Sequence, residues 1–183
     1  MSLVCRHKTF TFAVLAILFF STSILPANNQ QATAPLPEFT QRSATAWINS
    51  PPVSVSDLHG KVIMLDVWTY GCWNCYRSIP WMLTLENMFA KQGFQIIGIH
   101  TPEFKHEHDR DNVVSKMQEF KVTHPVMMDN DFSYWKALGN QYWPTFYIVD
   151  KQGNIRARFI GETHANTAQA HQMETLIKRL LQE

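Results

Sequence analysis

The sequence has few cysteines, few glycines and almost no net charge. Its seven glycines are scattered without a pattern, so there is no phosphate-binding glycine loop and no nucleophile elbow around a serine. The formal net charge is +1 and no long basic run occurs, which argues against a nucleic-acid-binding protein. The cysteines Cys5, Cys72 and Cys75 therefore carry the most distinctive chemistry in the chain.

The first 27 residues differ in composition from the rest of the chain. Basic residues at 6–8 precede an apolar run at 10–20, and a less apolar stretch at 21–25 leads to Pro26 and the small residue Ala27. This order is typical of a secretory signal, and the run is shorter than the roughly 20 residues that cross a bilayer. We expect 1–27 to be a signal peptide cleaved after Ala27. An uncleaved membrane anchor is the alternative, because Leu25 fits the −3 position poorly. Lipid attachment is not expected, since Cys5 precedes the apolar run.

The rest of the chain predicts a flexible linker at 28–37 and one globular domain at 38–183. The linker is polar and contains prolines, whereas the chain as a whole is 45% hydrophobic. Apolar runs, amphipathic spacing and turn residues predict alternating strands and helices with one terminal hairpin. The strands are expected at 62–68, 94–99, 125–128, 145–149 and 155–160, and the helices at 78–90, 109–120, 132–138 and 169–181. The pattern indicates an α/β fold that contains parallel crossovers.

Cys72 and Cys75 lie in the stretch WTYGCWNC, shortly after an apolar run. Haem attachment would need histidine at position 76, which is tyrosine. A structural zinc site needs four ligands, of which the pair supplies two. As a structural disulfide the pair would enclose almost no chain and would constrain the unfolded state very little.

Thiol–disulfide exchange needs only the two cysteines. A strand, a short turn and a helix would place Cys72 at a helix N-terminus, where free N–H groups and the helix dipole stabilise a thiolate. The residues by themselves favour redox chemistry, and metal binding remains the alternative.

Several ordered stretches resemble one family. They are AWINSPPVSVSDLHGKVIMLDVWTYGCWNC, IIGIHTPEF, GNQYWPTFYIVDKQGNIR and the late FIGE. From about Pro37 onward the chain resembles exported thioredoxin-fold proteins of the TlpA/ResA type, in particular the thioredoxin-like domain of DipZ-type cytochrome-biogenesis proteins. The resemblance implies a thioredoxin fold: a central mixed sheet flanked by helices, with an αβ insertion before a cis-proline strand.

The resemblance also implies roles for three residues at the redox centre. Cys72 matches the attacking thiol and Cys75 the resolving thiol, and the two form the disulfide of the oxidised protein. Asp66 matches a buried acidic residue beneath that disulfide. A carboxyl group in an apolar strand has a raised pKa and could take the proton of Cys75, or it could simply form a hydrogen bond at the strand end.

Further residues are expected to contact the substrate. Pro144 matches the cis-proline that faces the disulfide, and a cis bond would present the backbone of Trp143 to an extended substrate segment. Family members commonly carry tryptophan before the first cysteine, where this chain has Gly71. We expect Tyr70 and Trp73 to cover the site instead.

Histidine and acidic residues at 100–109 offer the rival interpretation, a copper or zinc site that would also use the thiols. His106 and His108 belong to a charged stretch of the kind that usually forms a solvated loop. His100 is expected at the carboxyl end of its strand, where sites gather in open α/β folds, and we assign it to the substrate site. We expect neither a metal nor a cofactor, because the dithiol can carry the electrons.

These observations predict an exported protein-disulfide reductase in the periplasm or another extracytoplasmic compartment. Its partners would be protein disulfides and a membrane thiol reductase of the DsbD/CcdA kind, with a role in cytochrome c biogenesis implied by the resemblance. No nucleic acid is expected, and membrane contact is expected only if 1–27 is retained. A peroxiredoxin-like peroxidase is an alternative that lacks its PxxxTxxC signature here. A metal-delivery module using His100 and the thiols is the other.

Overall fold

The computed structural model describes residues 34–183. The expected signal peptide and residues 28–33 of the expected linker lie outside this range. Within residues 34–183, no helix is both long and apolar enough to cross a membrane.

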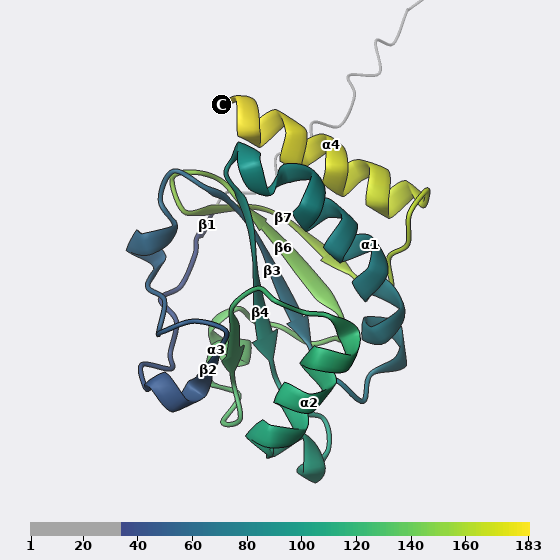
Figure 1. Cartoon of the computed structure of the whole chain (residues 1–183). Coiled ribbons are helices and arrows are strands. Elements are labelled where there is room, and N and C mark those ends of the chain that lie inside the picture. Colours follow the sequence, from purple (N-terminus) through teal and green to yellow (C-terminus); the bar gives the residue numbers. More distant parts are fainter. Residues whose placement is uncertain (1–33) are drawn as a thin grey trace, which may run out of the picture.

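In this part of the chain, seven strands form a single mixed sheet in the order β1-β7-β6-β3-β4-β5-β2. The strands are β1 (Ala34–Pro35), β2 (Trp47–Ile48), β3 (Val62–Trp68), β4 (Phe94–His100), β5 (Val126–Met128), β6 (Thr145–Val149) and β7 (Asn154–Ile160). The helices are α1 (Trp73–Phe89), α2 (Arg110–Phe120), α3 (Ser133–Ala137) and α4 (Ala168–Gln182). Figure 1 shows the sheet behind α1 and α4, with the carboxyl ends of β3 and β4 at the bottom.

The centre of the sheet is built from the most apolar runs of the sequence. β3 pairs in parallel with β4 and antiparallel with β6, and every residue of β3 and β6 is buried. Strands covered on both faces are continuously apolar, which explains why Val62–Trp68 contains a single charged residue. That residue, Asp66, pairs with Gly98 on one side and Phe146 on the other.

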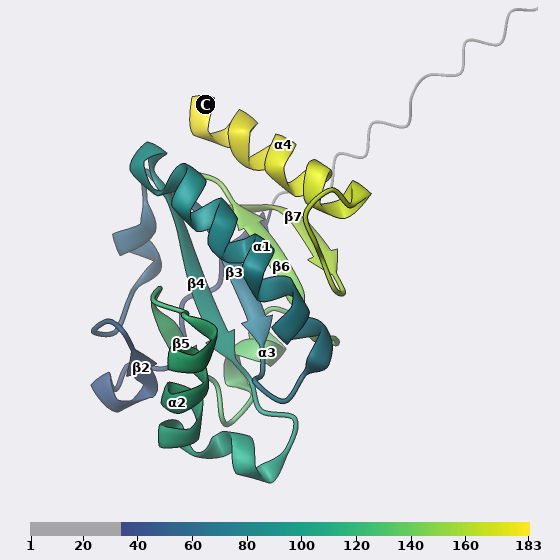
Figure 2. The same cartoon turned by 45° about the vertical axis from the view of Figure 1, so that its right-hand side comes forward.

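Helices cover both faces of the sheet, and the side-chain alternation of β3 separates the two hydrophobic cores. Met64 and Trp68 pack with residues of α1, α2 and α4 in one core. Leu65 and Val67 pack in the other core, with Tyr134 of α3 and with side chains that precede β3 in the sequence. Figure 2 shows α1, α2 and α4 on the same side of the sheet.

The expected insertion lies between β4 and β6. It consists of α2, β5 and α3, and β5 extends the sheet by pairing in parallel with β4. β6 and β7 then form the predicted antiparallel hairpin, and α4 closes the chain. The mixed sheet, the flanking helices and the insertion before Pro144 agree with the expected fold.

Most of the expected boundaries agree with the structure to within a residue, but two differ by several residues. The domain begins before residue 38, because β1 pairs with β7 and Leu36 is only 6% exposed. Residues 34–37 therefore belong to the domain and not to a flexible linker. Helix α1 begins at Trp73, five residues before the expected start at Ser78, because Cys72 acts as its N-cap. The sequence offers no serine, threonine, aspartate or asparagine at that cap position, so the usual start signal is missing.

Candidate functional site

Cys72 lies at the junction between the central strand and helix α1. β3 ends at Trp68, a three-residue turn follows, and Cys72 is the N-cap of α1. Its Sγ accepts a hydrogen bond from the backbone N–H of Cys75 at 3.2 Å. Cys72 and Cys75 are joined by a disulfide, with their Cα atoms 5.3 Å apart. Cys72 is partly exposed whereas Cys75 is only 3% exposed, so an incoming thiol or disulfide reaches Cys72 first.

Asp66 lies on the face of β3 that α1 covers, together with Met64 and Trp68. Its side chain is buried, and burial raises the pKa of its carboxyl group to about 8. A carboxyl group with such a pKa is close to a thiol in acidity, because an ordinary cysteine has a pKa of about 8.5. Proton exchange between Asp66 and a cysteine would therefore cost little free energy.

Pro144 follows a cis peptide bond, as expected from the family resemblance. The preceding residue, Trp143, donates a hydrogen bond from its indole N–H to the carbonyl of Thr101 at 3.0 Å. Its ring also packs against Trp135 of α3, with 4.3 Å between the ring centroids. Trp143 is thus held from two sides, two residues before the start of β6.

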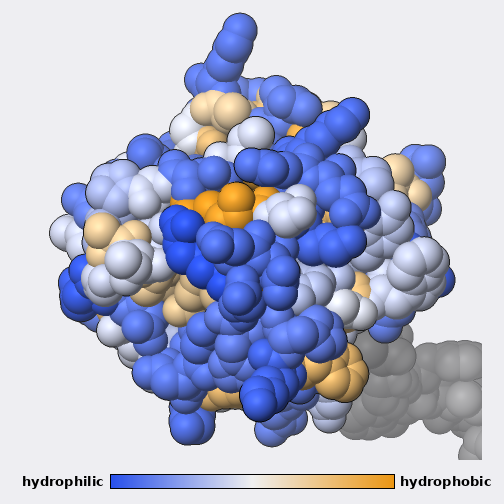
Figure 3. Space-filling model, turned by 60° about the horizontal axis from the view of Figure 1, so that its bottom comes forward, coloured by the Kyte–Doolittle hydropathy of each residue, from blue (hydrophilic) through white to orange (hydrophobic). Residues whose placement is uncertain are grey.

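Aromatic side chains surround the exposed sulfur. Trp73 is 63% exposed, stacks on Tyr76 at 5.2 Å, and lies beneath the guanidinium of Arg77. Tyr70 lies on the other side of the turn and donates a hydrogen bond to the carbonyl of His106 at 3.0 Å. A cavity of about 300 Å³ adjoins Cys72, lined by Tyr70, Gly71, Cys72, Trp73, Tyr76, Lys116, Glu119 and Phe120. Figure 3 shows the lower end of the molecule, which is mainly hydrophilic around a small hydrophobic area.

His100 is at the carboxyl end of β4, as expected, but it is fully buried. Its ring lies between those of Trp68 and Tyr70, and Nε2 is 3.3 Å from the hydroxyl of Thr69. Burial lowers the pKa of His100 to about 4, so the ring is neutral at physiological pH. Its burial removes His100 from the surface that a substrate would touch in this structure.

The other histidines and acidic residues of the rival metal site point in different directions. His106 stacks on Phe104, Glu107 turns inward, and Asp109 accepts the N–H groups at the start of α2. In the part of the chain from Ala34 onward, no three His, Cys, Asp or Glu side chains gather closely enough to hold a metal ion. This separation gives the metal-delivery interpretation no support.

Glu107 belongs to the site in a way that the sequence does not indicate, because the sequence offers it only as a ligand of the rival metal site. Its side chain is fully buried, and its Oε1 accepts a hydrogen bond from the N–H of Gly71 at 2.8 Å. The residue thus contacts the turn immediately before Cys72, although it is 36 positions away in the chain. Its place in the charged stretch 103–110 suggested solvent exposure, and only the tertiary contact reveals its role.

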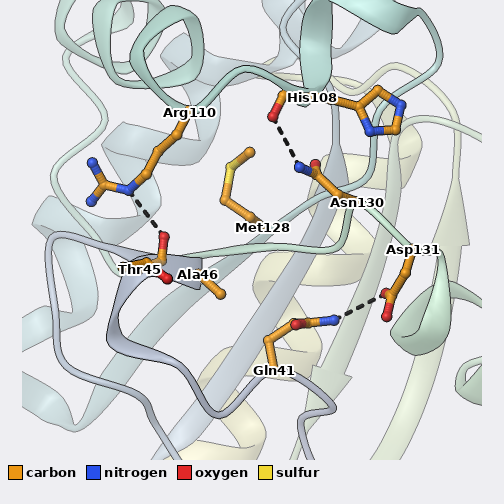
Figure 4. A pocket seen from close by; sticks show the side chains of 8 residues that line it. All are labelled: Gln41, Thr45, Ala46, His108, Arg110, Met128, Asn130 and Asp131. Atoms are coloured by element: carbon orange, nitrogen blue, oxygen red, sulfur yellow. Dashed lines mark hydrogen bonds between the residues drawn. The ribbon is translucent and has the colours of Figure 1, made fainter.

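A separate cavity of about 300 Å³ lies beside β2 and β5, lined by Gln41, Thr45, Ala46, His108, Arg110, Met128, Asn130 and Asp131. Its polar side chains are largely occupied with protein partners, as Figure 4 shows. Arg110 donates to the carbonyl of Thr45, Asn130 to that of His108, and Gln41 to Asp131. The cysteines do not line this cavity, so the redox chemistry belongs to the end of the sheet where Cys72 lies.

The fold and the cysteine pair define the class: a thioredoxin-fold protein with the disulfide centre of a thiol–disulfide oxidoreductase. Residues 31–177 match the Redoxin family, and the chain belongs to that family.

Individual relatives agree with this assignment. Protein DipZ of Mycobacterium tuberculosis is 33% identical over 145 residues, which are 78% of this chain but only 20% of DipZ. The thiol-disulfide oxidoreductase ResA of Geobacillus thermodenitrificans is 28% identical over 134 residues, covering 67% of this chain and 74% of ResA. A solved thiol:disulfide interchange protein of the thioredoxin family from Chlorobium tepidum is 23% identical, with a TM-score of 0.64 over 81% of this chain and 97% of that chain. At that identity the last likeness concerns the fold alone.

Proposed function

We propose that this protein is an exported protein-disulfide reductase that uses Cys72 and Cys75 as its dithiol. The observation that carries the proposal is the unequal exposure of two bonded cysteines at the N-terminus of α1. Helix N-termini stabilise anions, so the cysteine at the cap is the one that becomes a thiolate. The buried cysteine would then attack Cys72 in the mixed disulfide and displace the substrate thiolate.

The proposed reaction has two exchange steps. The Cys72 thiolate attacks one sulfur of a substrate disulfide, that disulfide breaks, and the leaving thiolate takes up a proton. In molecules in which Asp66 is ionised, its carboxylate then accepts the proton of Cys75, and the Cys75 thiolate attacks Sγ of Cys72. The second substrate thiolate leaves, so that two electrons have passed to the substrate and the Cys72–Cys75 disulfide has formed. Trp143 and Pro144 would hold the substrate backbone, with Trp73 and Tyr70 beside it.

The charges near the pair support the reductive direction. A strong oxidant needs a heavily stabilised thiolate in its reduced form. The cations near Cys72 are already paired: Arg77 with Glu162, and Lys116 with Glu119. An ionised Asp66 would oppose a thiolate still further. The reduced state therefore gains only moderate stabilisation.

The proposal extends to location and partners. Residues 1–27 would direct export to the periplasm or another extracytoplasmic compartment. A membrane thiol reductase of the DsbD/CcdA kind would return the disulfide to the dithiol, and the substrates would include proteins of cytochrome c biogenesis. Support comes from the basic–apolar–small order of residues 1–27 and from the similarity to DipZ.

Trapping of mixed disulfides tests the roles of the cysteines. Cys75→Ser should accumulate disulfide-linked protein partners on Cys72, because the resolving thiol is missing. Cys72→Ser is the matched control and should trap none. Mass spectrometry of the trapped species identifies the partners. The same spectra should show that this protein begins at Asn28 if the signal is cleaved as proposed.

Alkylation of the reduced protein at neutral pH gives an independent measure, and it should modify Cys72 much faster than Cys75. Equal alkylation rates, or partners trapped equally on both variants, would contradict the assignment. Efficient consumption of peroxide by the wild type would favour the peroxidase alternative.

A further inference from the structure

Glu107 binds three backbone amides with one carboxylate. It belongs to a 3₁₀ turn (Lys105–His108) that connects β4 to α2. Its Oε1 accepts the N–H of Gly71 at 2.8 Å, and its Oε2 accepts those of Glu103 at 2.6 Å and Phe104 at 2.8 Å. The carboxylate therefore links the loop after β4 to the turn that carries Cys72.

This carboxylate is ionised although it is buried. Burial acts to raise the pKa of Glu107, but the hydrogen bonds from Phe104, Thr69, Glu103 and Gly71 outweigh it, and the pKa lies below its ordinary value. Among the residues that the structure describes, no Lys, Arg or His nitrogen forms an ion pair with it (the cations beside Cys72 have other partners). The result is a fixed negative charge that peptide N–H groups stabilise.

Gly71 lets this charge approach the redox pair. A methyl group at position 71 would overlap Oε1 of Glu107, so any larger residue would push the carboxylate away from the turn. Gly71 does not adopt a positive φ, and contact with Glu107 is the reason for a small residue here. The amide that Glu107 occupies is also the one directly before the N-cap, at the end of the helix that stabilises a thiolate.

We propose that Glu107 is a positioning residue for the redox pair: it holds the turn before Cys72 and keeps a negative charge next to that cysteine, which limits the stabilisation of the reduced thiolate. The helix N-terminus favours the Cys72 thiolate and the Glu107 carboxylate opposes it, because like charges destabilise each other at short range. The inference deepens the proposed reductase function, on which its physiological meaning rests. The effect on Cys72 itself does not depend on any substrate.

The test measures the acidity of Cys72 and the redox equilibrium in purified protein without substrate. Glu107→Gln removes the charge, and Gly71→Ala displaces the carboxylate while leaving it in the chain. Glu103→Gln is the matched control, because it removes an exposed carboxylate from the same loop, where solvent screens the charge. Thiolate absorbance and the rate of alkylation against pH report the pKa of Cys72, and equilibration with glutathione reports the potential.

Both Glu107→Gln and Gly71→Ala are expected to lower the pKa of Cys72. The equilibrium with glutathione should shift about tenfold toward the dithiol in Glu107→Gln, which corresponds to a potential about 30 mV higher. The double variant should shift no further than Glu107→Gln, because both changes act on one interaction. Glu103→Gln should match the wild type.

An unchanged Cys72 pKa and potential in folded Glu107→Gln would overturn the inference. If that variant does not fold, an unchanged Gly71→Ala overturns it equally, and a lowered Cys72 pKa supports it. These results are separate from the trapping experiment: the wild type can reduce protein disulfides whether or not Glu107 affects Cys72, and failed trapping would leave the measured acidity of Cys72 intact.

Discussion

At the scale of single residues, the protonation of Asp66 affects both the stability of the folded protein and the proposed proton transfer from Cys75. The pKa of its carboxyl group is about 8 in the folded protein and 3.8 for an ordinary aspartate, so folding favours the protonated form. This contribution to stability is fully present below about pH 4 and is lost as the pH rises toward 8. A neutral amide at the same position would not show this loss.

We therefore expect Asp66→Asn to flatten the dependence of stability on pH. The difference between wild type and variant should change by up to about 1.4 kcal/mol per pH unit between pH 4 and 8, with the variant gaining as the pH rises. Denaturant unfolding of the oxidised proteins at several pH values measures this difference. A constant difference across that range would show that Asp66 is not held protonated.

The same variant separates the proposed base from a structural aspartate. Only the second exchange step needs the Cys75 proton removed, so Asp66→Asn should slow release of the mixed disulfide more than its formation. Stopped-flow kinetics with a disulfide peptide resolve the two steps, and equal rates in both proteins would leave Asp66 with a structural role only.

The site residues that the sequence could identify are those with a local or family pattern. The CxxC spacing located Cys72 and Cys75, and the family resemblance located Asp66 and Pro144. Glu107 could not be found in this way, because its contact with Gly71 joins segments 36 positions apart. The burial of His100 likewise depends on the rings of Trp68, at the end of β3, and Tyr70, in the turn after β3, and the segment around His100 does not reveal these contacts.

At the scale of elements, the start of α2 fixes the loop that carries Glu107. Asp109 is the N-cap and accepts the N–H groups of Asp111 at 2.9 Å and Asn112 at 3.1 Å. We expect Asp109→Ala to destabilise the protein by about 1 kcal/mol, since these N–H groups lose their acceptor. Asp109→Asn keeps a capping oxygen and should cost less. Chemical denaturation compares the variants, and equal losses for Ala and Asn would argue against a capping role.

The principal elements could be predicted because their signals are local. The hydrophobic runs of β3 and β4 and the hairpin turn between β6 and β7 lie within short windows of sequence. The two-residue strands β1 and β2 escaped prediction, since they exist only by pairing with β7 and β5. For α1 the apolar pattern predicts a start at Ser78, because a cysteine sulfur is not a usual cap signal, whereas the strand–turn–helix order around the cysteine pair places Cys72 at the helix N-terminus, as the structure confirms.

At the scale of the whole molecule, the proposed direction of electron flow rests on how charge is arranged around the N-terminus of α1. The helix supplies one stabilising influence, and the N–H of Cys75 already donates to Sγ of Cys72. Glu107 and an ionised Asp66 have the opposite effect and destabilise the thiolate. The nearby cations form ion pairs of their own, Arg77 with Glu162 and Lys116 with Glu119. These groups come from different elements of the fold, and the stability of the Cys72 thiolate depends on their combined effect.

We expect their sum to give a reduction potential nearer to that of thioredoxin, about −270 mV, than to that of the oxidant DsbA, about −120 mV. Equilibration of the wild type with glutathione, followed by tryptophan fluorescence, measures it, because Trp68 and Trp73 flank the pair. At a potential near −270 mV the Cys72–Cys75 disulfide would be harder to reduce than glutathione disulfide. The dithiol would then reduce protein disulfides that have a higher reduction potential. A value near −120 mV would mean that the helix outweighs both carboxylates, and the protein would then act as an oxidant with the same two cysteines in the same roles.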